Sequence, residues 1–194
     1  MWQARSVIGG LWAAFILYWL VLALFNKKVS GSTPRSSGWA VRVAVLVGVI
    51  VVLHVGRHAD PGLFVAFRRS ASFRPGIRVQ WTGVGLCLAG FAFAFWARAH
   101  LGRNWGMPMS MRQGHELVTS GPYAYVRHPI YSGLMLALIG SALAITLLWL
   151  ALFVLYFAYF LYSARTEEKM MLAQFPDTYP AYRHRTKMLI PFVF

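Results

Sequence analysis

Three short polar stretches in the second half of the sequence carry the side chains best suited to chemistry. They are His115-Glu116-Leu117-Val118, the segment GPYAYVRHPIYSG at residues 121–133, and a stretch that begins Arg165-Thr166-Glu167-Glu168. An arginine guanidinium can hold a carboxylate through two parallel hydrogen bonds, and a glutamate can pair with an ammonium group. The three stretches therefore offer binding groups for a charged ligand.

Each of these residues also has a simpler interpretation. Interfacial Arg and Tyr anchor membrane helices, and Pro129 is a typical proline of a first helical turn. His128 alone would be read as a hydrogen-bonded residue at the membrane surface. Anchoring does not explain why Gly-Pro-Tyr, Arg-His-Pro and Tyr-x-x-Gly occur together within residues 121–133. That co-occurrence favours a functional segment.

The composition indicates the setting in which these residues must work. Of the 194 residues, 58% are hydrophobic and 12% are charged, whereas a soluble domain carries about 25% charged residues. The apolar residues also come in long blocks. We therefore predict a single integral membrane domain over residues 1–194.

The formal net charge of +14 is explained by the same setting. The basic residues lie between the apolar runs, where Lys and Arg meet anionic lipid headgroups, so we expect membrane lipids as partners and no nucleic acid. Cys87 is the one cysteine, which excludes an intrachain disulfide. His100, His115 and His128 lack the helical spacing or the neighbouring cysteine of a metal site, so no metal is expected.

A membrane span needs about 20 apolar residues. Apolar runs predict three N-terminal spans at residues 7–25, 39–55 and 77–97, which together make up the region 1–97. The first run is longer than the ~7–15 residues of a signal-peptide core, so we interpret it as a retained span. Gly83, Gly85 and Gly90 in the third run would allow close helix approach.

The run from Ile130 to Ala164 contains no Asp, Glu, Lys or Arg. As a single helix it would measure about 52 Å, too long for a bilayer core of about 30 Å. A tight helical hairpin that turns near residues 144–149 fits best, which gives an all-α fold with about five transmembrane helices. The hairpin would bring Arg127-His128 beside the stretch from Arg165 to Glu168.

The same topology predicts an orientation. With five spans, the face that holds the tail and the long connector at residues 98–129 collects twelve Lys and Arg, against six on the other face. Positive residues favour the cytoplasmic side. We therefore expect the polar stretches at 115–118, 121–133 and 165–168 on the cytoplasmic face. The connector is longer than ordinary loops, and its Trp, Tyr and Pro content indicates an ordered segment.

The stretch HELVTSGPYAYVRHPIYSG resembles the isoprenylcysteine carboxyl methyltransferase family, whose signature reads His-x-Leu-Val, Gly-x-Tyr and Arg-His-Pro-x-Tyr-x-Gly. The tail RTEEKMMLAQFPDTYPAYRHRTKMLIP is similar to the family's pattern of Glu-Glu, Tyr-x-x-Tyr and Leu-Ile-Pro. The resemblance covers residues 95–194. It implies S-adenosylmethionine (SAM) as methyl donor and a catalytic half at 98–194. The cofactor pocket would be closed by the 98–129 connector and the C-terminal region.

The resemblance also implies roles for individual residues. Glu168 would bind the amino group of the cofactor, and Arg165 would hold the substrate carboxylate. Arg127 is a second candidate for that role or for the cofactor carboxylate. Glu116 occupies a variable position and would contribute its backbone. The full set implied to bind the cofactor is His115, Glu116, Leu117, Val118, Tyr123, His128, Pro129, Ile130, Tyr131 and Glu168.

This chemistry suits the residues present. The methyl group of SAM is activated by its sulfonium, so the protein mainly has to align donor and acceptor. A carboxylate acceptor is ionised at neutral pH and needs no base. The expected substrate is lipophilic and borne by the membrane, such as an isoprenylcysteine-like or isoprenoid acid.

Three alternatives remain open at this point. A phospholipid N-methyltransferase would need a base such as Glu167 or His128 to deprotonate the amine. A sterol-type reductase would bind NADPH, and a non-enzymatic membrane scaffold would bind no cofactor. Binding of SAM, S-adenosylhomocysteine or NADPH distinguishes them.

Overall fold

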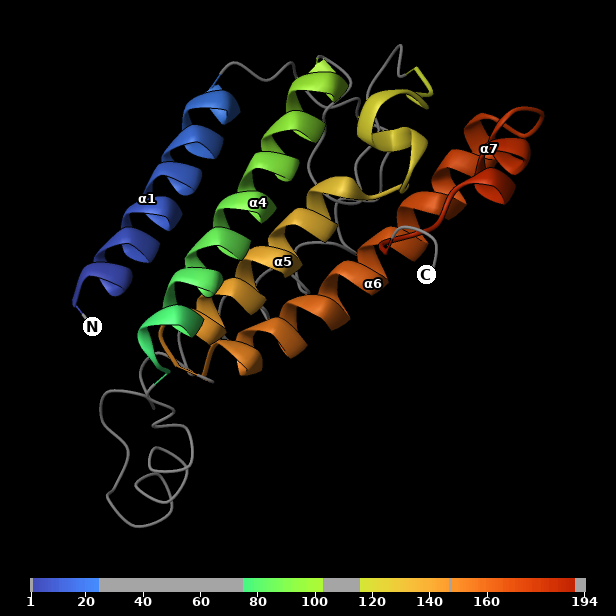
Figure 1. Cartoon of the computed structure of the whole chain (residues 1–194). Helices are drawn as coiled ribbons and strands as arrows, with labels where there is room; N and C mark the ends of the chain where they lie inside the picture. Colours follow the sequence, from blue (N-terminus) through green and yellow to red (C-terminus); the bar gives the residue numbers. More distant parts are fainter. Residues whose placement is uncertain (1, 25–74, 103–115, 147, 191–194) are drawn as a thin grey trace.

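The computed structural model describes residues 2–24, 75–102, 116–146 and 148–190. The predicted span at 39–55 and His115 lie outside these residues. The described elements are helical, and they are α1 (Trp2–Leu24), α4 (Ile77–Leu101), the short 3-10 helix η2 (Gly121–Ala124), α5 (Pro129–Ala144), α6 (Leu148–Gln174) and α7 (Tyr179–Arg185). Figure 1 shows α1, α4, α5 and α6 as long neighbouring helices, with η2 and α7 gathered at one end.

Helices α4 and α5 form the centre of the fold and pack antiparallel at very close range. A Cβ placed on Gly83 would lie 2.5 Å from the carbonyl oxygen of Gly140, and one placed on Gly90 would collide with the carbonyl of Gly133. Small residues at such positions let two helix backbones touch. The predicted roles of Gly83 and Gly90 are therefore confirmed, whereas among the described residues a Cβ on Gly85 would meet nothing within 4 Å, so Gly85 does not serve the contact between α4 and α5.

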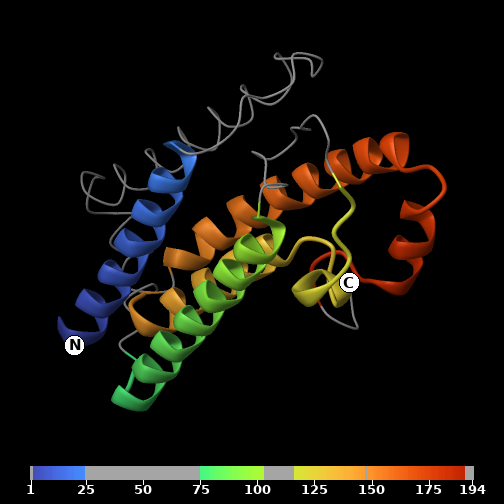
Figure 2. The same cartoon turned by 90° about the horizontal axis from the view of Figure 1, so that it is seen from above.

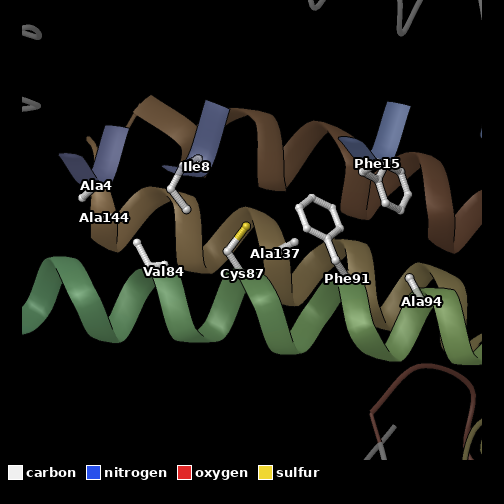
Figure 3. Close-up of a cluster of buried hydrophobic side chains, with 9 residues drawn as sticks. All are labelled: Ala4, Ile8, Phe15, Val84, Cys87, Phe91, Ala94, Ala137 and Ala144. Atoms are coloured by element: carbon white, nitrogen blue, oxygen red, sulfur yellow. The ribbon is translucent and has the colours of Figure 1, made fainter. Parts of the chain in front are cut away.

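Helix α1 covers the other side of this pair through aromatic and small apolar side chains. Phe15 stacks on Phe91 with ring centroids 4.7 Å apart, and Trp12 Nε1 donates a hydrogen bond to Ser141 Oγ at 3.0 Å. Figure 3 shows Phe15 of α1 beside Phe91 of α4, with Ile8 of α1 on the side of Cys87. Cys87 is fully buried in this cluster, as a small apolar residue in the middle of a span would be.

Helices α5 and α6 form the predicted hairpin. Helix α5 ends at Ala144 and α6 begins at Leu148, within the expected turn. By length and composition, α4 and the segment Trp149–Gln174 are able to cross a membrane, and α5 is a shorter apolar helix. Helix α4 also continues past the predicted end at residue 97 to Leu101, which places Arg98 inside the helix, where Arg98 Nη1 donates to the carbonyl of Gly102 at 2.9 Å.

The end of α6 and the following tail position the polar residues. Helix α6 continues beyond its apolar part through Glu167 and Glu168 to Gln174. The chain then turns into α7 and comes back toward η2 and the start of α5, as the view from above shows (Figure 2). A single parallel bridge between Val126 and Lys187 joins the returning tail to the segment before α5. Three segments that are distant in sequence therefore meet at one end of the bundle.

Candidate functional site

The centre of the site is a buried ion pair between Arg127 and Glu168. Arg127 lies two residues before α5, and Glu168 lies near the end of α6. Arg127 Nε is 2.6 Å from Glu168 Oε1, and their side chains are only 8% and 5% exposed. Charges are buried in this way only when they are paired and hydrogen-bonded. The hairpin therefore brings the two sequence clusters into direct contact, as predicted.

The second carboxylate, Glu167, is bound to α5. Tyr131 donates its hydroxyl to Glu167 Oε1 at 2.6 Å, and His128 Nδ1 lies 3.4 Å from Glu167 Oε2. The His128 ring stacks on Tyr131, which stacks in turn on Phe160 of α6 with ring centroids 4.5 Å apart. His128 and Tyr131 thus join an aromatic stack to two carboxylates.

The tail is held against the start of α5 by backbone hydrogen bonds. The backbone N–H of Arg127 donates to the carbonyl of Lys187 at 2.8 Å, and that of His128 donates to the carbonyl of Met188 at 3.1 Å. Ser132 Oγ also donates to the carbonyl of Leu189. We refer to residues 186–189 as the tail strap. The strap forms one side of the polar cluster, which consists of Arg127, His128, Glu167 and Glu168.

The 3-10 helix η2 sits on α7. The Tyr182 hydroxyl donates to the carbonyl of Tyr123 at 2.8 Å, and both tyrosines are buried. Gly121 has φ of +59°, and a Cβ there would lie 2.8 Å from the His100 ring, whose Nε2 is 2.9 Å from Ser120 Oγ. Glycine is needed here for both its backbone conformation and its lack of a side chain.

Two protonation states follow from these surroundings. Burial acts to lower the pKa of His128, but its contacts with Glu167 and Glu168 outweigh burial and raise that pKa above its ordinary value of 6.5. His128 is therefore stabilised as the imidazolium beside its two carboxylates. Burial raises the pKa of Tyr182 to about 12, so its hydroxyl stays neutral and can donate to Tyr123.

The structure brings together Arg127, His128, Tyr131 and Glu168 from the set that the sequence predicted. Tyr123 joins them indirectly through Tyr182. The remaining predicted residues lie around this centre: Pro129 is buried in the first turn of α5, Ile130, Leu117 and Val118 are half-buried, and Glu116 and Arg165 are exposed.

The tail around Arg183 also contributes to the site, which the sequence did not predict. Arg183 Nε lies 3.4 Å from Glu168 Oε2, and Arg127 Nη1 donates to the carbonyls of Arg183, at 3.1 Å, and Thr186. The Tyr-x-x-Tyr pattern at 179–182 was the available signal, since both tyrosines are buried and place α7 over the ion pair. Nothing in the sequence gave the direction of the Arg183 side chain.

Comparisons with known proteins point to one family. Residues 83–174 match the model of the isoprenylcysteine carboxyl methyltransferase (ICMT) family. Over 96% of its length, the chain is 26% identical to the protein-S-isoprenylcysteine O-methyltransferase of Schizosaccharomyces pombe, of which the match covers 84%.

Two further relatives are named as metal-resistance proteins. The chain is 37% identical to the cobalt-zinc-cadmium resistance protein CzcN of Cupriavidus metallidurans and 34% identical to the nickel-cobalt-cadmium resistance protein NccN of Alcaligenes xylosoxydans xylosoxydans. Each match covers 48% of this chain and less than half of the relative, 44% and 45% respectively. Within the residues that the structure describes, no three His, Cys, Asp or Glu form a group suited to a metal ion.

Proposed function

Because residues 83–174 match the model of the isoprenylcysteine carboxyl methyltransferase family, we propose that the chain is a SAM-dependent methyltransferase that esterifies the carboxylate of a lipophilic, membrane-borne substrate. One observation carries this proposal. The family match over residues 83–174 includes both partners of the buried pair, Arg127 and Glu168, which lie 2.6 Å apart in the structure. The region of family similarity therefore contains the central ion pair of the polar cluster, while Arg183 and the tail strap follow it in the chain.

The residues of the cluster fit the charges of this cofactor. SAM carries an ammonium, a carboxylate and a sulfonium. Glu168 is a buried carboxylate whose Oε2 faces a half-exposed guanidinium at 3.4 Å, so an ammonium group is a suitable partner for it. The stacked rings of His128, Tyr131 and Phe160 supply aromatic surface beside the carboxylates. Within this stack the His128 imidazolium lies on the Tyr131 ring, where a cation–π attraction is worth roughly 0.5–2 kcal/mol.

The chemistry of the transfer places modest demands on the protein. When bound, SAM supplies a methyl group on a positively charged sulfur, which a carboxylate oxygen can take in one displacement that leaves S-adenosylhomocysteine. The acceptor is already ionised, so the chain needs to hold and align it. Arg165, exposed on α6 one turn before Glu168, is proposed to bind that carboxylate.

The surface of the bundle is consistent with a substrate that arrives from the bilayer. Helix α6 exposes Val154 and Tyr162, which are 65% and 46% accessible, and its polar end follows directly on this apolar stretch. A lipophilic tail could therefore remain in the membrane while its carboxylate reaches the end of α6. We propose a multi-pass protein whose catalytic half, residues 98–194, opens to the cytoplasm.

Cofactor binding tests this proposal against its rivals. We would titrate the purified protein in detergent with SAM, S-adenosylhomocysteine and NADPH by calorimetry. Binding of the first two ligands without NADPH supports the proposal. Binding of NADPH alone would support a reductase, and binding of none of the three would support a scaffold.

Two substitutions separate the proposed roles. Glu168→Gln should weaken SAM binding, because it removes the partner of the ammonium. Arg165→Ala should leave SAM binding unchanged and abolish turnover of an acid substrate, while Lys169→Ala, an exposed neighbour on the same helix, serves as the control. Retained turnover in Arg165→Ala would refute the role of Arg165.

One observation favours a second candidate function, that of a phospholipid N-methyltransferase. Glu167 is 26% exposed and lies 3.4 Å from His128, and its carboxylate is the group that could accept a proton from an amine. A phospholipid N-methyltransferase would need that base. Labelling phosphatidylethanolamine in vesicles with methyl-radiolabelled SAM tests it, because an N-methyl product forms only if this second reading is right.

A further inference from the structure

The guanidinium of Arg127 is held by the protein itself through Nε and Nη1. Its Nε donates to Glu168 at 2.6 Å, and its Nη1 donates to the carbonyls of Arg183 and Thr186. The side chain is only 8% exposed. A ligand carboxylate bound through Nε or Nη1 would have to displace these internal partners, and the burial of the side chain limits access to the rest of the guanidinium, so Arg127 is poorly placed to bind one. Its contacts instead tie α6, α7 and the tail strap together.

Arg183, in contrast to Arg127, is exposed and loosely held. It lies on α7, its side chain is 51% exposed, and its Nε approaches Glu168 Oε2 at 3.4 Å. This distance is longer than a charge-assisted hydrogen bond of about 2.7–2.9 Å. Its partner Glu168 is bound tightly by Arg127 through the other oxygen, Oε1. The Glu168–Arg183 contact is therefore a loose ion pair with one accessible member.

A loose pair of this kind is complementary to an amino-acid head group. Such a head group carries an ammonium and a carboxylate on one carbon atom, so it can match a neighbouring carboxylate and guanidinium at the same time. A guanidinium offers several donors in a fork that suits a carboxylate. The ligand would replace one weak contact by two charge-assisted ones.

We propose that Arg183 binds the carboxylate of the methyl donor's amino-acid group, beside Glu168, and that Arg127 is the positioning residue that holds both in place. This inference rests on the proposed function, and it names the residue that takes the second charge of the cofactor. It also separates the three arginines of the site. Arg127 supports the structure, Arg165 is left for the substrate, and Arg183 serves the cofactor.

The test compares two ligands that differ only in the carboxylate. Calorimetry in nanodiscs would measure binding of SAM and of decarboxylated SAM to the wild-type protein, Arg183→Ala and Arg183→Lys. Arg185→Ala is the matched control, because it removes an exposed arginine from the same helix. Loss of a charged hydrogen-bond partner corresponds to roughly a 10- to 100-fold change in affinity.

The expected result is selective. Arg183→Ala should weaken SAM binding about 10- to 100-fold and leave decarboxylated SAM within about 3-fold of the wild type, with Arg183→Lys between the two. Equal losses for both ligands, or no loss for either, would overturn the assignment of Arg183. If the wild-type protein binds neither ligand, the proposed function itself fails, and that outcome is distinct from failure of Arg183 alone.

The positioning role of Arg127 has its own readout. Arg127→Gln removes the side-chain donors to Arg183, Thr186 and Glu168 but leaves the backbone hydrogen bonds to Lys187 and Met188, so the tail strap should loosen. Trypsin should then cleave after Arg185 and Lys187 at least several-fold faster than in the wild type. Arg183→Ala should leave the cleavage rate unchanged. Slow cleavage in Arg127→Gln would show that Arg127 does not hold the strap.

Discussion

Breaking the Arg127–Glu168 pair should destabilise the protein strongly. At 2.6 Å and an effective dielectric constant of about 20, the gross attraction between two unit charges is about 6 kcal/mol. Desolvation of both groups offsets much of that attraction, and removal of one partner of a buried pair costs about 3–5 kcal/mol. Arg183 and His128 remain within 3.4 Å and 3.6 Å of Glu168. We therefore expect the lower end, about 3 kcal/mol, for Arg127→Met.

A double-mutant cycle measures this interaction directly. The free energy of unfolding would be taken from sodium dodecyl sulfate titrations in mixed micelles for Arg127→Met, Glu168→Met and the double variant. The double variant should lose clearly less than the sum of the single losses, with a coupling of at least about 1.5 kcal/mol. Arg185→Met, which changes an exposed arginine of the same tail, should lie within about 0.5 kcal/mol of the wild type. A coupling below about 0.5 kcal/mol would refute the view that this pair organises the site.

Three further predictions test the packing and the electrostatics. Gly90→Ala should cost about 1–3 kcal/mol of unfolding free energy, because the added methyl group meets the α5 backbone, while Gly85→Ala should cost nothing in the same titration. Gly121→Ala should cost about 1–3 kcal/mol, because φ is +59° and the His100 ring lies 2.8 Å from the new atom; a midpoint equal to that of the wild type would contradict this. The pKa of His128 is raised above 6.5 in the folded state, so its stabilising contribution is fully present below pH 6.5 and is lost as the pH rises through the higher folded value. His128→Gln should flatten this part of the stability profile, and an unchanged slope would show that another group is responsible.

The sequence predicted the elements of the fold where the pattern was local. The uncharged run from Ile130 to Ala164 was too long for one span, and the structure has the expected hairpin, with α5 ending at Ala144 and α6 beginning at Leu148. The hairpin then placed Arg127 beside Glu168 by topology alone. The end of α4 was predicted four residues too early, because Arg98 was taken as the membrane boundary. A helix can extend beyond the membrane, and α4 continues to Leu101.

The parts that could not be predicted depend on side-chain direction. Gly83, Gly85 and Gly90 looked equivalent in sequence, but the helical period turns Gly85 away from α5. Arg127 and Arg183 are chemically identical, and only the fold shows that one is enclosed by internal acceptors and the other is half exposed. The role of each arginine therefore follows from burial, which composition and spacing do not reveal.

Transfer of the methyl group tests the central claim most directly. The purified protein in nanodiscs would be incubated with methyl-radiolabelled SAM and N-acetyl-S-farnesyl-cysteine, and the lipid extract would then be treated with base. A carboxyl methyl ester releases its label as volatile methanol, whereas an N-methyl group does not. We predict volatile label that depends on the farnesylated acid and disappears in Arg165→Ala. Absence of any label from the extract, or label that resists base, would contradict the proposal that the protein is a carboxyl methyltransferase.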